Sequence, residues 1–285
     1  MEKEINSRIG KVVAMIRANK KLTLKEVTGG EFSESMVSLL ESGKHSISVD
    51  KFFTILVHSK VYLDEFEYLY NDYSQRPDQI FENEVSKAYA NKDLTALKKL
   101  HTFWSDKAEH SKNKFDKINK IYTQLIIAIV EKSVPFREDV GFLMDYLESV
   151  DEWGRYELWI FSNCTSFFDD NALKYYGTLI LGKTNFYKRL TNQAMVITTF
   201  LNIINAWLTR KNLPQALKYI NHVKEIGIPF DCFLEKLFLN YHEAHYHYLQ
   251  GYDKNKSELK KVIKTLEDYG FQSEADAWTK EIDTF

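Results

Sequence analysis

The chain has 285 residues, of which 44% are hydrophobic and 14% aromatic, so it can bury a sizeable core and does not have the composition of a disordered protein. Its formal net charge of −2 gives no overall signal for nucleic acid or for a membrane surface, although charge can still be local. The low content of glycine (11) and proline (4) favours long helices over the glycine-rich loops of a doubly wound α/β enzyme.

Residues 1–70 are predicted to form a helix-turn-helix domain. An apolar stripe at helical spacing runs from Ile5 to Asn19. Thr23 can cap a short second helix, which Gly29-Gly30 would end, and Ser33 is the N-cap candidate of the next helix, ESMVSLLE. Two more short helices follow before residue 73. Two closely joined short helices within such a series are typical of a helix-turn-helix.

DNA-binding side chains are expected on this domain. Between Ile5 and Lys25 there are six basic residues and no acid, a block that can neutralise phosphates. The helix after Ser33 presents small polar groups near its start, where a recognition helix meets bases. A merely solvated helical face is the alternative. We expect phosphate contacts from Arg17 and Lys21 and base contacts from Ser35 and Ser38, within a DNA-binding set of Arg8, Arg17, Lys21, Ser33, Ser35, Met36, Ser38 and Lys44.

Residues 71–285 show a weak internal repeat. Five segments share a long helix, a short polar turn and a second helix that contains A-L or E-L, with turns near residues 92, 135, 170, 212 and 253. A spacing of roughly 35 to 43 residues in a helical chain indicates stacked helical hairpins. The predicted fold class is therefore all-α, with the N-terminal helix-turn-helix domain followed by a superhelical array of about five tetratricopeptide-like hairpins.

The segment GTLILGKT, residues 177–184, matches the phosphate-binding P-loop pattern G-x-x-x-x-G-K-[ST]. A P-loop follows a buried strand, but the preceding residues DDNALKYY begin a helix. Three aliphatic residues also occupy the variable positions, and at helical period they continue an apolar stripe through Leu173, Tyr176 and Tyr187. We therefore expect a helix here, and a P-loop ATPase is the least favoured function.

Asparagine recurs on the first helix of each predicted hairpin, at Asn83, Asn119, Asn163, Asn202 or Asn205, and Asn240. First helices line the concave wall of a superhelical stack, and an asparagine there can bond both the N–H and the C=O of an extended peptide. Scattered surface amides are an equally weighted alternative. The expected peptide-binding residues are Asn163, Thr199, Asn202, Leu234, Phe238 and Tyr241.

Other features speak against a metal, a cofactor or a membrane. In HEAHYH, residues 242–247, the second histidine of a zincin motif is replaced by Tyr246, so no metal site or cofactor is expected. The two cysteines, Cys164 and Cys232, are too few for a disulfide framework and suit a reduced, cytoplasmic compartment. The start of the chain lacks a signal-peptide core, and the most apolar run, near 125–130, is too short to span a bilayer.

The order of these parts resembles the Rgg/GadR/MutR transcriptional regulators of low-GC Gram-positive bacteria. Three stretches carry the resemblance: FSESMVSLLESGKHSIS from Phe32, SVDEWGRYELWIFSNCTSF from Ser149 and FLEKLFLNYHEAHYHYLQG from Phe233. The resemblance implies a cytoplasmic homodimer, with residues 71–285 as the peptide-sensing and dimerisation domain. It also implies binding to double-stranded promoter DNA under the control of a short hydrophobic signalling peptide, as in quorum sensing. RNA polymerase is a candidate further partner.

The chain also departs from this family's pattern. Family recognition helices often carry Gln and Arg where this chain has Met36 and Leu39, so base reading would rest on the serines or on DNA shape. Some relatives have a linker Cys where this chain has Val49, and relatives that sense hydrophobic peptides have Arg where we align Ser86 and Ser166. The alternative function is a helical-repeat adaptor for peptides or proteins, without peptide control; no enzymatic activity is expected.

Overall fold

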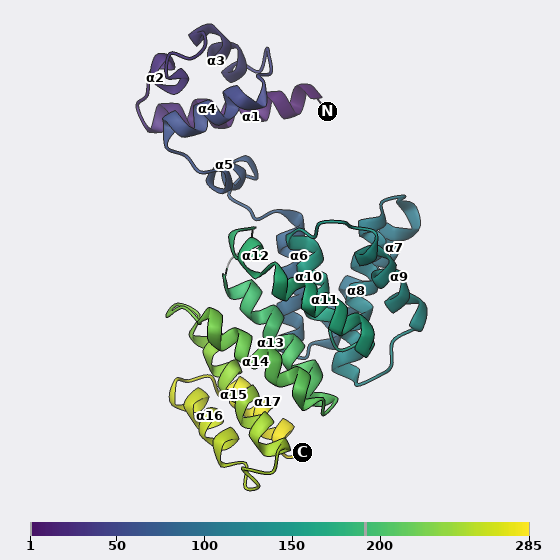
Figure 1. Cartoon of the computed structure of the whole chain (residues 1–285). Helices are drawn as coiled ribbons and strands as arrows, with labels where there is room; N and C mark the ends of the chain where they lie inside the picture. Colours follow the sequence, from purple (N-terminus) through teal and green to yellow (C-terminus); the bar gives the residue numbers. More distant parts are fainter. Residues whose placement is uncertain (1, 191–192, 285) are drawn as a thin grey trace. The chain divides into compact units, whose positions relative to one another are not determined.

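The computed structural model describes residues 2–190 and 193–284, and its regular structure is helical throughout (Figure 1). These residues form no β-strand, so the predicted all-α fold class is confirmed. The chain divides into two compact units, Met1–Asp93 and Leu94–Phe285. The predicted functional boundary at residue 70 precedes the last helix of the first unit and stays a prediction.

The first unit is built from short helices around one small core. Val13 on the first helix, Val37 on the third and Ile55 on the fourth meet in this core. Thr23 caps the second helix in a capping box with Glu26, as expected from the sequence. The helices are α1 (Glu2–Asn19), α2 (Leu24–Thr28), α3 (Glu34–Glu41), α4 (Val49–Ser59), α5 (Leu63–Tyr70) and α6 (Pro77–Ala90).

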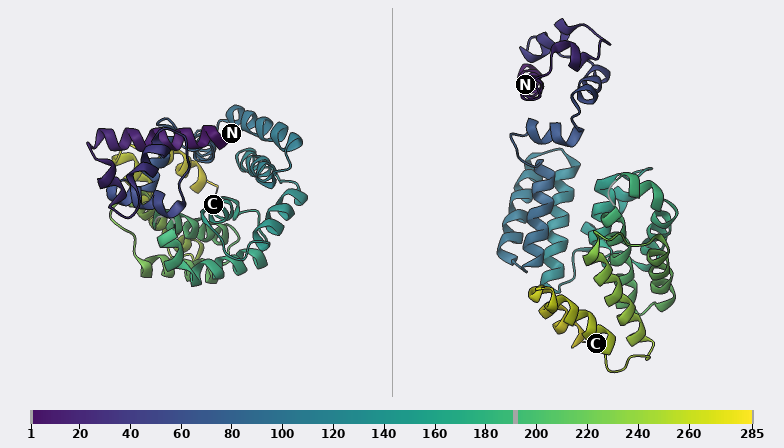
Figure 2. Two further views of the ribbon diagram at one scale, coloured as in Figure 1. Left: turned by 90° about the horizontal axis from the view of Figure 1, so that it is seen from above. Right: turned by 90° about the vertical axis from the view of Figure 1, so that its left-hand side faces the viewer.

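The second unit consists of packed helical hairpins. Four of the five predicted turns lie between two of its helices, and the turn near residue 92 joins α6 of the first unit to α7. Figure 2 shows α7 beside α8 and α13 beside α14 in both views. The sequence repeat did not predict the short α12 or the terminal α17. The helices are α7 (Leu94–His110), α8 (Lys114–Glu131), α9 (Arg137–Glu148), α10 (Arg155–Cys164), α11 (Asp170–Gly182), α12 (Thr184–Leu190), α13 (Gln193–Thr209), α14 (Leu213–Ile226), α15 (Phe233–Leu249), α16 (Ser257–Asp268) and α17 (Gln272–Ile282).

Helix α13 is the most enclosed element of this unit. It packs against α10, α11, α12, α14 and α15. Its buried side chains cover more than half of the helix circumference: Val196, Ile197, Thr199, Phe200, Leu201, Ile203, Ile204, Ala206, Trp207 and Leu208. Thr198, Asn205 and Thr209 form a narrow exposed strip on the remaining side. With five neighbouring helices, α13 is the central packing element of the second unit.

The segment GTLILGKT is helical, as predicted. Residues 177–182 belong to α11, Lys183 is the C-cap and Thr184 opens α12. The hydroxyl of Thr184 donates to the backbone carbonyl of Leu181 at 2.9 Å and does not face a phosphate-binding loop. Gly177 has a packing role, because a Cβ atom there would lie 2.4 Å from the hydroxyl oxygen of the fully buried Tyr219.

Several helix-flanking turns place lysine in the left-handed backbone region, which usually favours glycine. At Lys60 and Lys132 the lysine is the C-cap residue. Their φ values lie between 51° and 56°, and the residues concerned are Lys21, Lys60, Lys92, Lys132, Lys211 and Lys256. A positive charge at a helix C-terminus interacts favourably with the helix dipole, which partly offsets the backbone strain.

We predict that Gly177→Ala destabilises the protein by about 1–3 kcal/mol, because the new methyl group would overpack against Tyr219. Gly141→Ala, in the interior of α9 with no atom within 4 Å of the added Cβ, is the matched control and should stabilise by roughly 0.5–1 kcal/mol. Urea unfolding of both variants measures the difference.

A second substitution tests whether the Tyr219 hydroxyl oxygen causes the loss of stability in Gly177→Ala. Tyr219→Phe removes the hydroxyl oxygen, and the next nearest atom, Cζ, lies 3.0 Å from the added Cβ. The double variant Gly177→Ala/Tyr219→Phe should therefore recover most of the lost stability. Equal stability of the single and double variants would contradict this packing role.

Candidate functional site

The exposed face of α3 carries the first group of candidate residues. Ser33 occupies the N-cap position without capping the helix, and its hydroxyl lies 3.0 Å from that of Ser35. Ser35 and Ser38 are exposed, as is Lys44 just after the helix. Met36 is half-buried, and its sulfur accepts a hydrogen bond from Lys51 Nζ at 3.6 Å. The start of α3 therefore presents small hydroxyl groups to solvent, close to a lysine.

Arg17 is engaged within the domain and not turned towards solvent. Its Nε and Nη2 atoms donate to the two carboxylate oxygens of Glu41 at 2.6 and 2.8 Å, and Nη1 donates to the Leu22 carbonyl at 3.2 Å. The hydrogen bonds to Glu41 raise the pKa of Arg17 further. This bidentate pair joins the end of α1 to the end of α3. In this structure Arg17 helps to position α3, and its role as a phosphate contact stays a prediction.

The other predicted basic residues differ in how they are engaged. Arg8 pairs with Asp72 and lies over the ring of Tyr70, with 4.8 Å between the guanidinium carbon and the ring centroid. That guanidinium ties α1 to the end of α5. Lys21 is exposed in the turn after α1 and makes no ion pair with any described residue. Lys21 is thus well placed to meet a phosphate.

The polar residues predicted for peptide binding all form hydrogen bonds within the protein, and one of the three joins two helices. Asn202 on α13 donates from Nδ2 to the carbonyl of Ser162 at 2.9 Å and to its hydroxyl at 3.2 Å, which ties α13 to α10. Thr199 is 0% exposed, and its hydroxyl donates to the Met195 carbonyl. Asn163 is half-buried and donates from Nδ2 to the Trp159 carbonyl at 2.8 Å. Asn163 and Asn202 are both half-buried, so Thr199 is the least accessible of the three.

The predicted aromatic wall on α15 divides between the core and the surface. Tyr241 is buried, with its ring 4.4 Å from that of Trp278 on α17, and burial raises its pKa. Phe238 is half-buried and packs on the same tryptophan at 4.9 Å. Leu234, one turn earlier, is exposed. The spacing was correctly identified as one face of a helix, but that face is covered by α17, which sequence analysis did not expect.

A polar and aromatic wall on α8 and α10 was not singled out as a unit. The hydroxyl of Tyr156 on α10 donates to Asn119 Oδ1 on α8 at 3.2 Å. Tyr122 on α8 packs on Trp159 of α10, with the ring centroids 4.2 Å apart. Tyr156 and Asn163 are seven residues apart and so share a face of α10. The sequence contained both residues in features already noted. Asn119 is one of the recurrent asparagines, and Tyr156 lies in the stretch SVDEWGRYELWIFSNCTSF.

Two of the three histidines of α15, His242 and His245, are buried, whereas His247 is partly exposed and lies 2.7 Å from a carboxylate oxygen of Glu258. Burial is the main cause that lowers the pKa of His242 to about 3 and that of His245 to about 4. Both imidazoles are therefore neutral around neutral pH. The described residues contain no group of three His, Cys, Asp or Glu side chains that could hold a metal ion. In the same part of the chain, no helix is long and apolar enough to cross a membrane.

Comparison with known proteins agrees with this geometry. Residues 103–280 match the family model described as HTH-type transcriptional regulator Rgg, C-terminal domain. Among solved structures, the SHP pheromone receptor Rgg2 of Streptococcus dysgalactiae is 21% identical, with a TM-score of 0.77 and coverage of 96% of this chain and 99% of that chain.

Two further structures extend the likeness. A protein of Listeria monocytogenes EGD-e, classed with transcriptional regulators, is 22% identical, with a TM-score of 0.80 and coverage of 98% of this chain and 97% of that one. The PrgX/cCF10 complex is 16% identical, with a TM-score of 0.67 and coverage of 97% and 99%. At these identities the likeness shows a common fold.

Proposed function

The chain belongs to the Rgg family of HTH-type transcriptional regulators, and on this premise we propose that it binds promoter DNA through its first unit under the control of a short peptide bound by its second. The observation that carries the proposal is that one chain has both surfaces. These are the exposed hydroxyl face of α3 and the polar and aromatic wall of α8 and α10. A peptide-binding adaptor would need the second of these surfaces but not the first.

The DNA-binding surface in this proposal is the start of α3 with its flanking lysines. Ser35 and Ser38 are short, so they would reach base edges only if α3 lies deep in the major groove. The Arg17–Glu41 pair holds the end of α3 against the end of α1. Lys21 and Lys44 are exposed and would hold phosphates. Most of the affinity would then be electrostatic, with the serines adding sequence preference.

The peptide site in this proposal is the wall of α8 and α10. Because Nδ2 of Asn163 is used within its own helix, its Oδ1 atom would accept from a peptide N–H. The Asn119–Tyr156 pair would offer further polar contacts, while the Tyr122–Trp159 ring pair supports this wall from within. The peptide would therefore be mostly apolar, with its backbone recognised by amides. Structurally similar proteins described as a pheromone receptor or as a peptide pheromone/receptor complex support this reading.

We also propose a homodimer joined through α4. Val49, Phe53 and Val57 lie at i, i+4 and i+8 on one helical face, and Val49 and Val57 are 69% and 61% exposed. A stripe of exposed large apolar residues on a short helix marks a contact surface. A dimer would set two copies of α3 against two half-sites, as DNA-binding helix-turn-helix proteins do. Action on promoters places the protein in the cytoplasm, where RNA polymerase is a candidate partner.

The DNA surface makes a first prediction. Lys21→Ala should weaken binding to all DNA sequences and lower the salt slope of log K by about 0.9, the value of one lost phosphate contact. Ser35→Ala/Ser38→Ala should change the preferred sequence with a smaller loss of total affinity. Electrophoretic mobility shifts over a range of salt, with Lys254→Ala as the charge-matched control, measure both effects. Wild-type binding by both variants would place the DNA surface elsewhere.

The peptide wall makes a second prediction. The probe is a fluorescently labelled candidate peptide that is short and mostly apolar. Asn163→Ala should weaken its binding by about 1–3 kcal/mol, or roughly five- to 150-fold, because a backbone N–H of the peptide loses its acceptor. Tyr156→Phe should weaken binding less. Fluorescence polarisation measures both, and Asn221→Ala, exposed on the second helix α14, is the matched control.

The competing outcome is also defined. If Asn163→Ala and Asn221→Ala bind the peptide alike, with helix content intact by circular dichroism, the α8–α10 wall is not the peptide site. A response of Thr199→Ser or Phe238→Leu in the same assay would instead favour the wall first predicted on α13 and α15.

The dimer makes a third prediction. Val57→Lys should convert a dimer into a monomer in sedimentation velocity, because a charge in a buried apolar stripe is costly. Val134→Lys, at a loop position that is 94% exposed in the second unit, is the control and should leave the mass unchanged. A dimer that persists in Val57→Lys would contradict the role of α4.

A further inference from the structure

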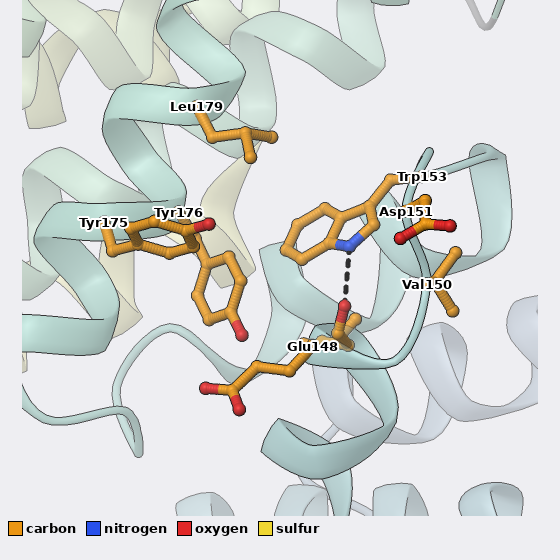
Figure 3. A pocket seen from close by; sticks show the side chains of 8 residues that line it. Glu148, Val150, Asp151, Trp153, Tyr175, Tyr176 and Leu179 are labelled. Carbon is orange, nitrogen blue, oxygen red and sulfur yellow. Dashed lines mark hydrogen bonds between the residues drawn. The ribbon is translucent and has the colours of Figure 1, made fainter.

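A pocket of about 500 Å³ lies outside both proposed surfaces, between the end of α9 and the middle of α11 (Figure 3). It is framed by second helices of two successive hairpins, whereas the proposed peptide wall lies on first helices. Its residues come from the end of α9, the loop to α10 and one face of α11: Leu147, Glu148, Val150, Asp151, Trp153, Tyr175, Tyr176 and Leu179. A cavity of this volume suits a small organic molecule.

The lining of this pocket has an unusual chemical character. Glu148 and Asp151 contribute two carboxylates, and no lysine, arginine or histidine lines the pocket. Both carboxylates are exposed and form no ion pair with any residue in the described ranges. The pocket therefore carries a negative charge that the protein leaves uncompensated at this place.

Aromatic rings form the walls around these carboxylates. The indole of Trp153 is fixed because its Nε1 donates to the Leu147 carbonyl at 2.9 Å, and its ring lies 4.9 Å from that of Tyr176. Tyr175 is 63% exposed, and its ring is 5.1 Å from that of Tyr176. Figure 3 shows the tyrosines on one side and the indole facing them. Such ring faces attract cations.

One buried polar group adds a hydrogen-bond acceptor to this lining. Tyr176 is only 2% exposed, and among the described residues its hydroxyl has the nearby Glu148 carboxylate to donate to. Burial, the charge of that carboxylate and the hydrogen bond to it raise the pKa of Tyr176. A hydroxyl that donates to Glu148 still has lone pairs, so this oxygen is available to accept a hydrogen bond from a donor in the pocket.

We propose that this pocket binds a small organic cation, an ammonium or guanidinium group on an alkyl chain. The cationic head donates to Glu148, Asp151 and the Tyr176 hydroxyl, and the alkyl chain lies against the Trp153 and Tyr175 rings. A metal ion does not suit the site, because rings occupy most of its wall and only two carboxylates are present. Neither the DNA surface nor the peptide wall uses these residues, so the proposal does not rest on the proposed function.

The test uses the full-length protein and agmatine, which carries a guanidinium and an ammonium on one short alkyl chain. Charge-assisted hydrogen bonds at a partly exposed site lead us to expect a Kd of about 0.1–1 mM at low salt. Saturation-transfer NMR titration measures it. Glu148→Gln and Asp151→Asn should each weaken binding about three- to tenfold, and Asp145→Asn, which is exposed on α9 outside the pocket, should leave it unchanged.

A ring substitution separates the pocket from a plain acidic surface. Tyr175→Leu should weaken agmatine binding about two- to fivefold, whereas Tyr175→Phe keeps the ring face and should bind like wild type. Because Tyr175 is mostly exposed, neither change should affect folding. Equal loss in both variants, or in neither, would overturn the role of the aromatic wall.

Two further arms distinguish the sources of the cation. If acetyl-Gly-Arg-Gly-amide binds as tightly as agmatine, the pocket takes a cationic side chain of another polypeptide; if only agmatine binds, it takes a free amine. Either result supports the proposal. It is overturned if agmatine shows no binding up to about 10 mM, if neutral butane-1,4-diol binds equally well, or if Mg²⁺ binds in place of agmatine.

Discussion

The second unit depends on the packing of α13 against five neighbouring helices. Polar side chains on the packed part of such a helix need partners within the protein, because water has little access to them. Thr199 achieves this through its own helix, and Asn202 through Ser162 on α10. The second bond fixes how far α10 can slide along α13, so the positions of Tyr156 and Asn163 on α10 follow from an amide on another helix. The same packing buries Thr199 completely and occupies the Nδ2 atom of Asn202.

In the first unit, a side-chain contact likewise fixes one helix against another. Its core is formed by short helices, and α3 has only Val37 and Leu40 among its fully buried side chains. Two buried side chains leave the rotation of so short a helix weakly defined. The bidentate contact of Arg17 with Glu41 supplies a second, directional restraint. The orientation of the exposed serines of α3 thus depends on the partly buried Arg17–Glu41 pair.

The helical turns were predictable because polar, glycine or proline residues interrupt an apolar period at each of them, and this signal is local. The division of the candidate residues between binding and packing was not, because it depends on neighbours distant in sequence. Asn202 and Asn163 look alike in the chain, yet only Asn202 faces a backbone carbonyl of another hairpin. Tyr241 lies in the core because Trp278 packs on it, and Trp278 belongs to α17, a helix that the repeat pattern does not predict. The resemblance added the family but could not decide these individual contacts.

The lysines in left-handed turns have a consequence for the lifetime of the protein in a cell. Each non-glycine residue in this region costs roughly 1–2 kcal/mol, of which a charge at a helix end recovers only part. The six lysines named above therefore keep the fold below the stability that glycine at the same positions would allow. Because proteases remove the transiently unfolded fraction, a difference of this size changes steady-state abundance several-fold. Five of these six turn residues, all except Lys21, lie outside both proposed surfaces, and they thereby contribute to how quickly the protein is replaced.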